Sequence, residues 1–397
     1  MKGRIVLFAL LLLALTQAAC AQVRLFPRKG RQEVLDTAKV AVPDSTVAAP
    51  VDSVAPAPVI VAPSVVQVRL QLPLSGSDEQ KAGYMNFYEG FLLGLRQAAA
   101  EGIRAEVSVQ ECSEPVQEGP FHLAVDVTHS PQALARNVSA CPDWTVVPLE
   151  QDMDAMADSC RVALVAGGWQ ARTLELVRWI REDWHWGDKL FVLSPGDDPK
   201  TEFLKEALRS EGLRFLSLSG NYTQQDYSII AGTARFVLVA EDPGYTASAV
   251  NFLSGGIKAQ KAETAFYCTS KVRSYARRFE EDALGNANTR MVTSYYVDYA
   301  APAVDAFIQD FRRYYGAEPN QFAFHGYDTA LYFVRLAAVY GAQWPLGLEK
   351  DGAPAHGLLT DFRFKREAGD TGFVNTAFRR ISYDPDLNET ISSTLAE

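Results

Sequence analysis

The clearest pattern of apolar and polar positions lies in residues 65–102. Residues 65–72 are mostly apolar and β-branched and end at Pro73, which predicts a buried strand. The polar turn PLSGSDE follows, and Ser77 or Asp78 stands where a helix cap is needed. Apolar side chains then recur at the i, i+3, i+4, i+7 spacing of an amphipathic helix: Tyr84, Phe87, Tyr88, Phe91, Leu92 and Leu95. Because the apolar faces of the strand and the helix must both be buried against other elements, this unit predicts a layered α/β protein.

Strands and helices alternate through the rest of the chain. In the first half the pattern predicts strands at 105–110, 121–127, 144–149 and 161–168, a helix beginning at Ser130 and a helix over 169–183. A second series follows, with strands in KLFVLS, LRFLSLS, RFVLVAED, ETAFYCTS and TRMVTSYYVDY and helices at 246–260, 271–284 and 302–315. Such alternation with short loops is typical of parallel sheets covered by helices. The length of 397 residues is too great for one small core and predicts two lobes.

The last third of the chain adds one helix and one hairpin. The apolar run FAFHGYDTALYFVRLAAVYG predicts a helix over 322–341. LTDFRFKR and FVNTAFRRISY read as two strands joined by the turn EAGDTG. Residues 387–397 lack a pattern, so we expect a flexible tail there.

The N-terminus has the pattern of a signal peptide. Two basic residues precede the apolar run IVLFALLLLAL, which is too short for a spanning helix with normal flanks. Small residues at Ala19 and Ala21 suit cleavage before Gln22, whereas Cys20 suits lipoprotein anchoring. We favour a signal peptide over 1–21 and an exported protein of the periplasm or cell envelope. Residues 22–64, rich in Pro, Ala and Val, then form an extended, disordered tether.

Composition and charge exclude several classes of function. The formal net charge of −10 argues against a nucleic-acid-binding protein, which needs a basic surface. Besides Cys20, the cysteines stand at 112, 141, 160 and 268 without a CxxC pair, and the histidines are isolated, which argues against a zinc site. In an oxidising compartment Cys112 and Cys141 form a disulfide in our first interpretation, with buried free thiols as the alternative.

Enzyme motifs are missing from the sequence. It contains no GxSxG, HExxH, GxGxxG or P-loop GK[ST], so we expect no catalysis, no metal and no cofactor. Asp152, Asp154 and Asp158 form an acidic cluster that is more typical of a solvated helix start. A cluster of tryptophans indicates hinge packing or, alternatively, a partner-binding patch: Trp179, Trp184 and Trp186.

Four segments in order carry a resemblance to a known family: VRLQLPLSG, YEGFLLGL, YYVDYAAPAVDAFIQDFRRYYGAEPNQFAFHGYDTALYF and DFRFKREAGDTGFVNTAFRRISY. This order resembles the type I periplasmic binding proteins, in particular the branched-chain amino-acid receptors and relatives that often carry a LysM module. The similarity spans about residues 65–385. The sequence departs from the family in lacking LysM, in a compressed region 111–160, and in the loop DVTHSP, which keeps Thr128 and Ser130 but adds His129.

The resemblance implies a Venus-flytrap fold, in which two open sheets flanked by helices are joined by three crossovers and a small ligand lies between them. It also implies discontinuous lobes. Residues 65–186 with 322–350 form the first lobe, and 187–321 with 357–386 form the second. The helix at 326–341 then returns to the first lobe, and the terminal hairpin returns to the second.

Candidate ligand contacts in the first lobe follow the ends of predicted strands. Hydroxyl and N–H groups at a helix N-terminus suit an anion such as a carboxylate, and Ser75, Ser77 and Asp78 offer them. Thr128, His129 and Ser130 offer the same groups after the third strand. In both loops the alternative is helix capping alone. Trp169, after Gly167 and Gly168, stacks on a ligand or belongs to the wall between the lobes.

Candidate contacts in the second lobe are acidic and aromatic. A ligand ammonium group needs a carboxylate such as Glu241 or Asp242 and an aromatic wall such as Tyr245, while solvated turn residues are the alternative. Tyr267 ends the next strand, and the same two interpretations, ligand contact or turn residue, apply to it. Asp328 in the motif GYD reads as a helix cap or a hinge contact rather than a ligand group.

Two functions remain open on the sequence. The first is a solute receptor that closes on an amino acid or similar molecule and delivers it to a membrane transporter or sensor. The second is a cell-envelope scaffold or regulator, for example of peptidoglycan synthesis, that uses the same fold without a small ligand. A ligand-dependent rise in melting temperature separates the two.

Overall fold

The structure is a computed structural model that describes residues 60–141, 143–150, 161–220, 222, 228–230, 232–260, 263–280, 282–366, 372–386 and 388–396. The expected signal peptide, most of the expected tether, Cys160 and the acidic cluster at 152–158 lie outside the described residues. Within the described part of the chain, no helix combines the length and the apolar character that a membrane span needs.

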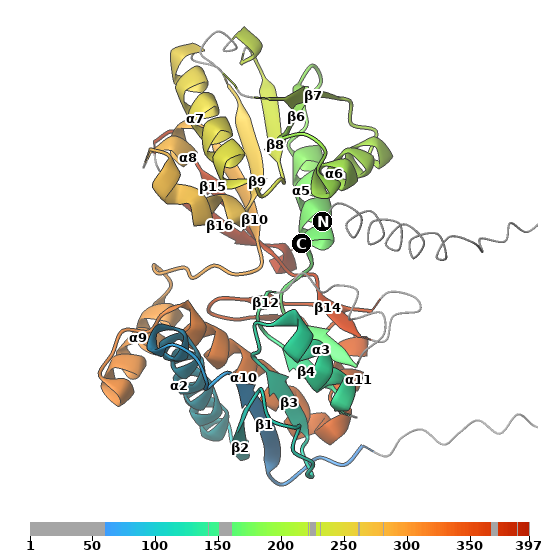
Figure 1. The fold of residues 1–397 in the computed structure, drawn as a ribbon, viewed down its shortest axis with the longest axis vertical. Coiled ribbons are helices and arrows are strands. Elements are labelled where there is room, and N and C mark those ends of the chain that lie inside the picture. Colours follow the sequence, from blue (N-terminus) through green and yellow to red (C-terminus); the bar gives the residue numbers. More distant parts are fainter. Residues whose placement is uncertain are drawn as a thin grey trace, which may run out of the picture. The chain divides into compact units, whose positions relative to one another are not determined.

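The first sheet has the strand order β13-β14-β5-β4-β3-β1-β2 (Figure 1). Its strands are β1 (Val66–Leu72), β2 (Ala105–Glu111), β3 (Leu123–Asp126), β4 (Thr145–Val147), β5 (Val162–Leu164), β13 (Phe364–Lys365) and β14 (Phe373–Asn375). All neighbours pair in parallel except β13, which is antiparallel to β14. Apart from that edge, the sheet is the parallel one that the alternating pattern predicts.

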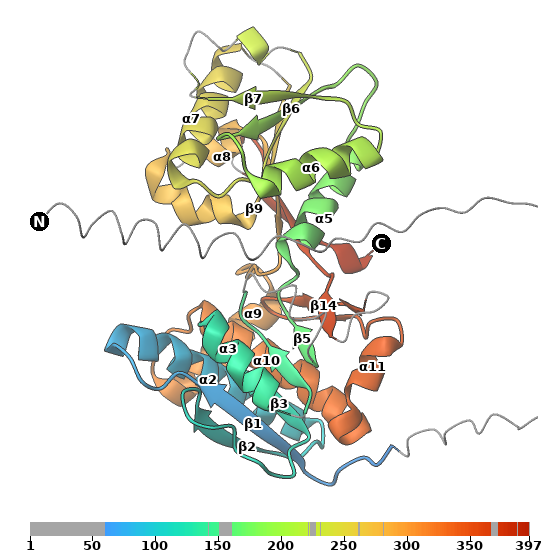
Figure 2. The same ribbon diagram turned by 45° about the vertical axis from the view of Figure 1, so that its right-hand side comes forward.

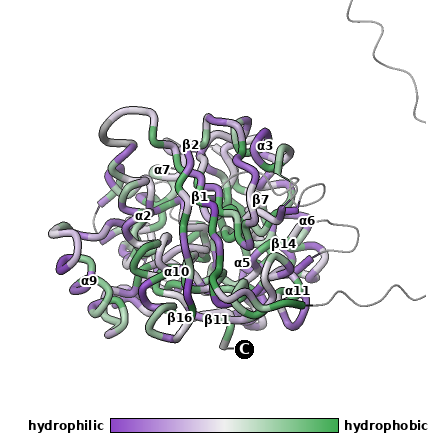
Figure 3. Tube along the Cα trace, turned by 90° about the horizontal axis from the view of Figure 1, so that it is seen from below, coloured by the Kyte–Doolittle hydropathy of each residue, from purple (hydrophilic) through white to green (hydrophobic). Residues whose placement is uncertain are grey.

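Helix α2 (Asp78–Ala100) packs against α10 (Gln321–Tyr340) and, with it, covers one face of the first sheet (Figures 1 and 2). The apolar positions of β1 join this core, which confirms the strand and helix predicted for residues 65–102. The two helices approach closely at Gly90 and Gly326, where an added Cβ atom would overlap backbone of the other helix. In Figure 3 hydrophobic and hydrophilic residues alternate along β1, whose polar positions face away from this core.

Shorter elements complete the first lobe, by which we mean the first sheet and the helices packed on it. They are α3 (Pro131–Ala140), α9 (Pro302–Tyr315), the 3₁₀ turn η3 (Gly341–Gln343), α11 (Pro345–Glu349) and the small ladder β11 (Ala355–His356) with β12 (Asp361–Phe362). Helix α3 packs its buried Leu134 and Val138 against β4 and β5, so it covers the polar side of the sheet (Figure 2).

The second sheet has the order β16-β15-β10-β9-β8-β6-β7. Its strands are β6 (Lys189–Ser194), β7 (Phe215–Ser219), β8 (Ala234–Leu238), β9 (Ala265–Thr269), β10 (Thr289–Thr293), β15 (Arg379–Tyr383) and β16 (Glu389–Ser393). The helical elements of this second lobe are α5 (Trp169–Glu182), α6 (Pro199–Ser210), α7 (Pro243–Gln260), η2 (Ser270–Arg278), α8 (Ala283–Asn286) and η4 (Thr394–Ala396). Helices α5 and α6 share one apolar core with this sheet, and α7 and α8 share another.

The chain passes between the lobes three times, between β5 and α5, between β10 and α9, and between β14 and β15. Two sheets of this kind joined by three crossovers are the fold class that the sequence predicts. The chain therefore forms two discontinuous α/β lobes.

The expected boundaries differ from the structure at several places. Helix α5 belongs to the second lobe, because its apolar face packs on β6 and α6, and α9 belongs to the first, because it packs on α2 and α10. The hairpin β13–β14 joins the first sheet through β5 rather than the second. Residues 389–393 form strand β16 against β15 instead of a flexible tail. Apolar periodicity predicts each element but does not say which sheet the element packs on.

Candidate functional site

In the turn after β1, backbone N–H groups and a hydroxyl bind a side-chain carboxylate of the protein itself. Glu111 ends β2 and accepts the N–H groups of Leu74 at 2.7 Å and Ser75 at 2.9 Å, while the Ser75 hydroxyl donates to it at 3.3 Å. Partial burial acts to raise the pKa of Glu111, but hydrogen bonds from the Cys112 thiol and from backbone N–H groups leave that pKa below its usual value. Ser77 lies exposed immediately before α2. Of the groups predicted to bind a ligand carboxylate, the N–H and hydroxyl of Ser75 thus bind Glu111.

The loop after β3 is fixed by a buried carboxylate. Asp126 accepts the N–H of Thr128 at 2.8 Å and the side-chain amide of Asn137 at 2.9 Å. Burial raises the pKa of Asp126. Ser130 caps α3, because its hydroxyl oxygen accepts the N–H of the third helical residue at 3.4 Å, and His129 is exposed beside it. For Ser130 the capping alternative therefore describes the observed contact.

A mixed cluster lies at the carboxyl ends of β6 and β8 in the second lobe. The Lys200 ammonium lies 2.9 Å from the Glu241 carboxylate and 5.7 Å from the centre of the Trp169 ring. Trp169 in turn meets Phe203 edge to face, with ring centroids 5.2 Å apart. The hydroxyl of Tyr275 donates to the Glu241 carbonyl oxygen at 2.8 Å. Two predicted ligand residues, Trp169 and Glu241, are thereby brought together by Lys200.

Lys200 was not among the residues predicted from sequence. A signal for it exists in the segment PGDDPK, where Asp198 caps α6 by accepting the N–H of Thr201 at 2.7 Å. The cap places Lys200 in the first turn of the helix, beside the loop after β8. An expected ammonium acceptor, Glu241, is consequently already paired with an ammonium group of the protein.

Two other predicted aromatic residues point elsewhere. Tyr245 lies in the first turn of α7 and is buried, and its hydroxyl bonds to the hydroxyl of Tyr222. Tyr267 is fully buried, and its hydroxyl donates to Asp183 at 2.7 Å and accepts from Arg290 at 2.7 Å. Asp183 follows α5 and Arg290 lies near the start of β10, so this hydroxyl is directed toward the amino ends of the strands. These contacts do not support ligand binding by either tyrosine.

Direct bonds connect the loop after β4 with the second lobe. Arg172 of α5 pairs with Glu150, and its guanidinium also donates to the carbonyl of Gly167 at 2.9 Å. The hydroxyl of Tyr295, in the second crossover, donates to the carbonyl of Pro148 at 2.5 Å. Burial raises the pKa of Tyr295, which keeps this hydroxyl a donor. Sequence patterns gave no signal for these pairs, because the partners are far apart in the chain.

Asp328 and Arg379 hold the segment beside the crossovers. The Asp328 carboxylate accepts the N–H groups of residues 358, 359 and 360 at 2.8, 2.7 and 3.0 Å. Burial nevertheless raises the pKa of Asp328 to about 6. Arg379 pairs with Asp361 at 3.0 Å and donates to the carbonyl of Gly357 at 2.7 Å. These contacts agree with the hinge interpretation of Asp328.

The expected disulfide is wrong, because Cys112 and Cys141 are both free thiols. The Cys112 thiol donates to Glu111 at 3.4 Å, and the Cys141 sulfur lies 2.6 Å from a guanidinium nitrogen of Arg69. Each sulfur is thus held by a different polar neighbour.

The three tryptophans of the predicted cluster do not act together. Trp179 and Trp184 pack in the second-lobe core, whereas Trp186 is fully exposed. Among the described residues, no group of three or more His, Cys, Asp or Glu side chains is arranged to hold a metal ion.

The sequence matches no family model and no curated protein. Solved structures do match it. A protein described as a branched-chain amino acid ABC transporter from Rhodospirillum rubrum is similar with a TM-score of 0.59 at 14% identity, over 83% of this chain and 100% of that one. A periplasmic ligand-binding protein of a branched-chain amino acid ABC transporter from Burkholderia xenovorans gives 0.56 at 11% identity, over 83% and 95%. A substrate-binding protein from Desulfitobacterium hafniense in complex with Leu gives 0.51 at 14% identity, over 83% and 100%. Together with the geometry above, these likenesses show that the chain has the two-lobe α/β fold of the type I periplasmic binding proteins.

Proposed function

We propose that this protein is an exported, non-enzymatic solute-binding protein that closes on a small polar ligand, an amino acid or similar molecule, between its two lobes. The observation that carries the proposal is the cluster of Trp169, Lys200 and Glu241. It lies outside the carboxyl ends of parallel strands, where open α/β sheets bind their ligands. Proteins of the same fold named as amino acid transporter components add support. Residence in the periplasm or cell envelope and delivery to a membrane transporter belong to the same proposal.

The cluster binds a zwitterion by exchanging one ion pair for two. A ligand carboxylate takes the Lys200 ammonium, a ligand ammonium takes the Glu241 carboxylate, and the Trp169 ring covers the ligand. Both internal partners are partly exposed, with side-chain exposures of 21% and 33%. Partly exposed pairs of this kind contribute only about 0–1 kcal/mol, so separating the pair costs little. The ligand then favours the closed arrangement of the lobes.

Thermal unfolding with a library of L-amino acids tests this proposal. A ligand at one hundred times its Kd raises the free energy of unfolding by about 2.7 kcal/mol, which raises Tm. Lys200→Met and Glu241→Gln should each abolish that rise. Lys205→Met is the matched control, because Lys205 lies on the same helix and pairs with Glu202 at 2.7 Å, away from the cluster. A rise in Tm that survives both cluster substitutions would contradict the proposed site.

The second candidate function is a cell-envelope scaffold or regulator that needs no small ligand. Two observations favour it: Glu111 occupies the turn after β1, and Arg172 and Tyr295 already bond the second lobe and the crossover to the loop after β4. Such a protein should show no rise in Tm with any solute of the library. It should instead bind an envelope protein or peptidoglycan fragments in a pull-down with purified components.

A further inference from the structure

The polar face of β1 carries an unusual buried cation. Residues Gln67, Arg69 and Gln71 alternate with the apolar core positions of the strand. Arg69 is only 2% exposed, under α3 and under a strap segment, by which we mean residues 112–120 between β2 and β3. A central strand of a parallel sheet is normally apolar on both faces, so this arginine needs a physical reason.

The direct contacts of the Arg69 guanidinium are with neutral groups. It donates to the carbonyl of Gln117 at 2.9 Å, lies 2.6 Å from the Cys141 sulfur, and sits 5.3 Å from the centre of the Phe121 ring. Among the described residues, no carboxylate forms a direct ion pair with it, and its Nε has no hydrogen-bond partner. A compensating charge lies in the buried Asp126 carboxylate: burial raises the pKa of Asp126, and the Arg69 charge acts to lower it. Burying a cation without a direct ion pair is costly. A bound anionic group would offset that cost.

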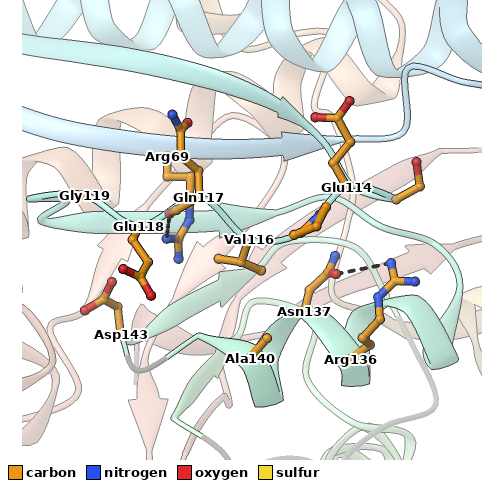
Figure 4. A pocket seen from close by; sticks show the side chains of 12 residues that line it. Arg69, Glu114, Val116, Gln117, Glu118, Gly119, Arg136, Asn137, Ala140 and Asp143 are labelled. Carbon is orange, nitrogen blue, oxygen red and sulfur yellow. Dashed lines mark hydrogen bonds between the residues drawn. The ribbon is translucent and has the colours of Figure 1, made fainter.

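A cavity of about 680 Å³ opens beside Arg69, between the strap segment and α3 (Figure 4). This volume falls within the range of about 300–1,000 Å³ that small-ligand sites occupy. Arg136 lies at one end of the cavity, where it donates to the Cys112 carbonyl at 3.0 Å. Glu118 and Asp143 lie beside one another at the other end (Figure 4), and neither forms an ion pair among the described residues. Arg69 lies on the side of Glu118 in this view, so the cavity presents one cation near the two carboxylates and a second cation, Arg136, at the far end.

We propose that this cavity is a second ligand site, independent of the cluster at Lys200, and that it takes a small zwitterion such as an amino acid or a short peptide. The ligand carboxylate pairs with Arg69, and the ligand ammonium pairs with Glu118 and Asp143. A simple anion fits less well, because it would face both carboxylates without a compensating cation. A simple cation fits less well, because it would face both arginines. A molecule with both charges satisfies Arg69 and the two carboxylates together.

The test follows the Arg69 Nε–H resonance by NMR in protein labelled with ¹⁵N-arginine, with L-alanyl-L-alanine as the probe. The dipeptide should shift this resonance in a saturable way. The N-acetylated dipeptide and the dipeptide amide, which each lack one charge, should bind at least about tenfold more weakly. Arg69→Gln assigns the resonance by removing it. No saturable shift, or an equal shift with either blocked dipeptide or with inorganic phosphate, would overturn the proposal.

Substitutions at the rim of the cavity test the proposal even if the Arg69→Gln variant does not fold. The double variant Glu118→Gln, Asp143→Asn should weaken binding of the dipeptide at least about tenfold and leave the resonance in place. Glu114→Gln is the matched control, since Glu114 lines the same cavity on the Arg136 side (Figure 4) and should leave binding unchanged. Lys200→Met should also leave the Arg69 response unchanged. A loss of that response in Lys200→Met would place the dipeptide at the other site, and unchanged binding in the double variant would refute the ammonium contact.

Discussion

His325 lies in α10 beside the second crossover and should make the stability of the protein depend on pH. Its ring centroid is 4.2 Å from that of Tyr295 and 6.5 Å from that of Phe87. The side chain is buried, and its Nδ1 has no partner among the described residues. Burial without a carboxylate partner disfavours the imidazolium, and it lowers the pKa of His325 from 6.5 to about 3.

The sign and size of the effect follow from linkage. Between pH 6.5 and pH 3 the unfolded chain binds a proton at His325 and the folded chain does not, so stability falls as pH falls. Each pH unit below 6.5 costs about 1.4 kcal/mol, so lowering the pH from 7 to 5 costs about 2 kcal/mol. Asp328, one turn further along α10, acts in the opposite direction. Its pKa of about 6 stabilises the fold below pH 3.8, and this contribution is lost as pH rises through 6.

The variant His325→Gln separates the two effects. Urea unfolding of the wild type and the variant at pH 7 and pH 5 gives four free energies, and the difference between the proteins should change by about 2 kcal/mol in favour of the variant at pH 5. His129→Gln is the control, because His129 is exposed and should leave the pH dependence unchanged. Parallel pH dependences of the wild type and His325→Gln would refute the reasoning, since they would mean that the ring is protonated or solvated in the folded protein.

Two further predictions concern the packing of each lobe. Gly90→Ala should lower the free energy of unfolding by about 1–3 kcal/mol in urea unfolding, because the added Cβ overlaps the backbone of α10. Gly83→Ala is the control: its Cβ would lie 3.5 Å from the nearest ring atom, so this substitution should be neutral or stabilising. Arg380→Gln should cost about 1–3 kcal/mol, because Glu175, itself only 4% exposed, loses the guanidinium that lies 2.6 Å away and keeps only that of Arg178 at 2.7 Å. Arg209→Gln, on an exposed helical pair, should cost less than about 1 kcal/mol in the same assay. Equal losses within either matched pair would contradict these assignments.

The fold could be predicted from the sequence largely because local patterns specify its units. The alternation VQVRLQL and the helical repeat after it identify β1 and α2, and the same reasoning identifies most other strands. Lobe membership could not be predicted as well. The apolar face of α5 must be buried, but it could pack on either sheet. The strand β13 has only two residues and is too short to show a hydrophobic period.

The site could be predicted less completely, because its contacts depend on register. Ser75 was a candidate from its place before a helix, but its partner Glu111 stands 36 residues later in the sequence. The two meet because β1 and β2 pair in parallel with Leu72 opposite Glu111. Arg69 is a comparable case: the sequence predicts a buried strand here, but nothing in VQVRLQL shows that the strap segment and α3 cover this cation.

The contacts of Glu111 in the first lobe and of the Lys200–Glu241 pair in the second lobe differ in how readily a ligand could replace them. Glu111 belongs to the same chain as its donors and accepts from three backbone N–H groups and a hydroxyl. A free ligand carboxylate would have to displace this side chain, whose effective concentration at the turn is high. The Lys200–Glu241 pair is a single contact between two partly exposed side chains. Separating it forfeits little, and both charges then become available to a zwitterion. If the protein binds a solute between its lobes, the second lobe therefore supplies the charged anchors, and the turn after β1 contributes shape rather than charge.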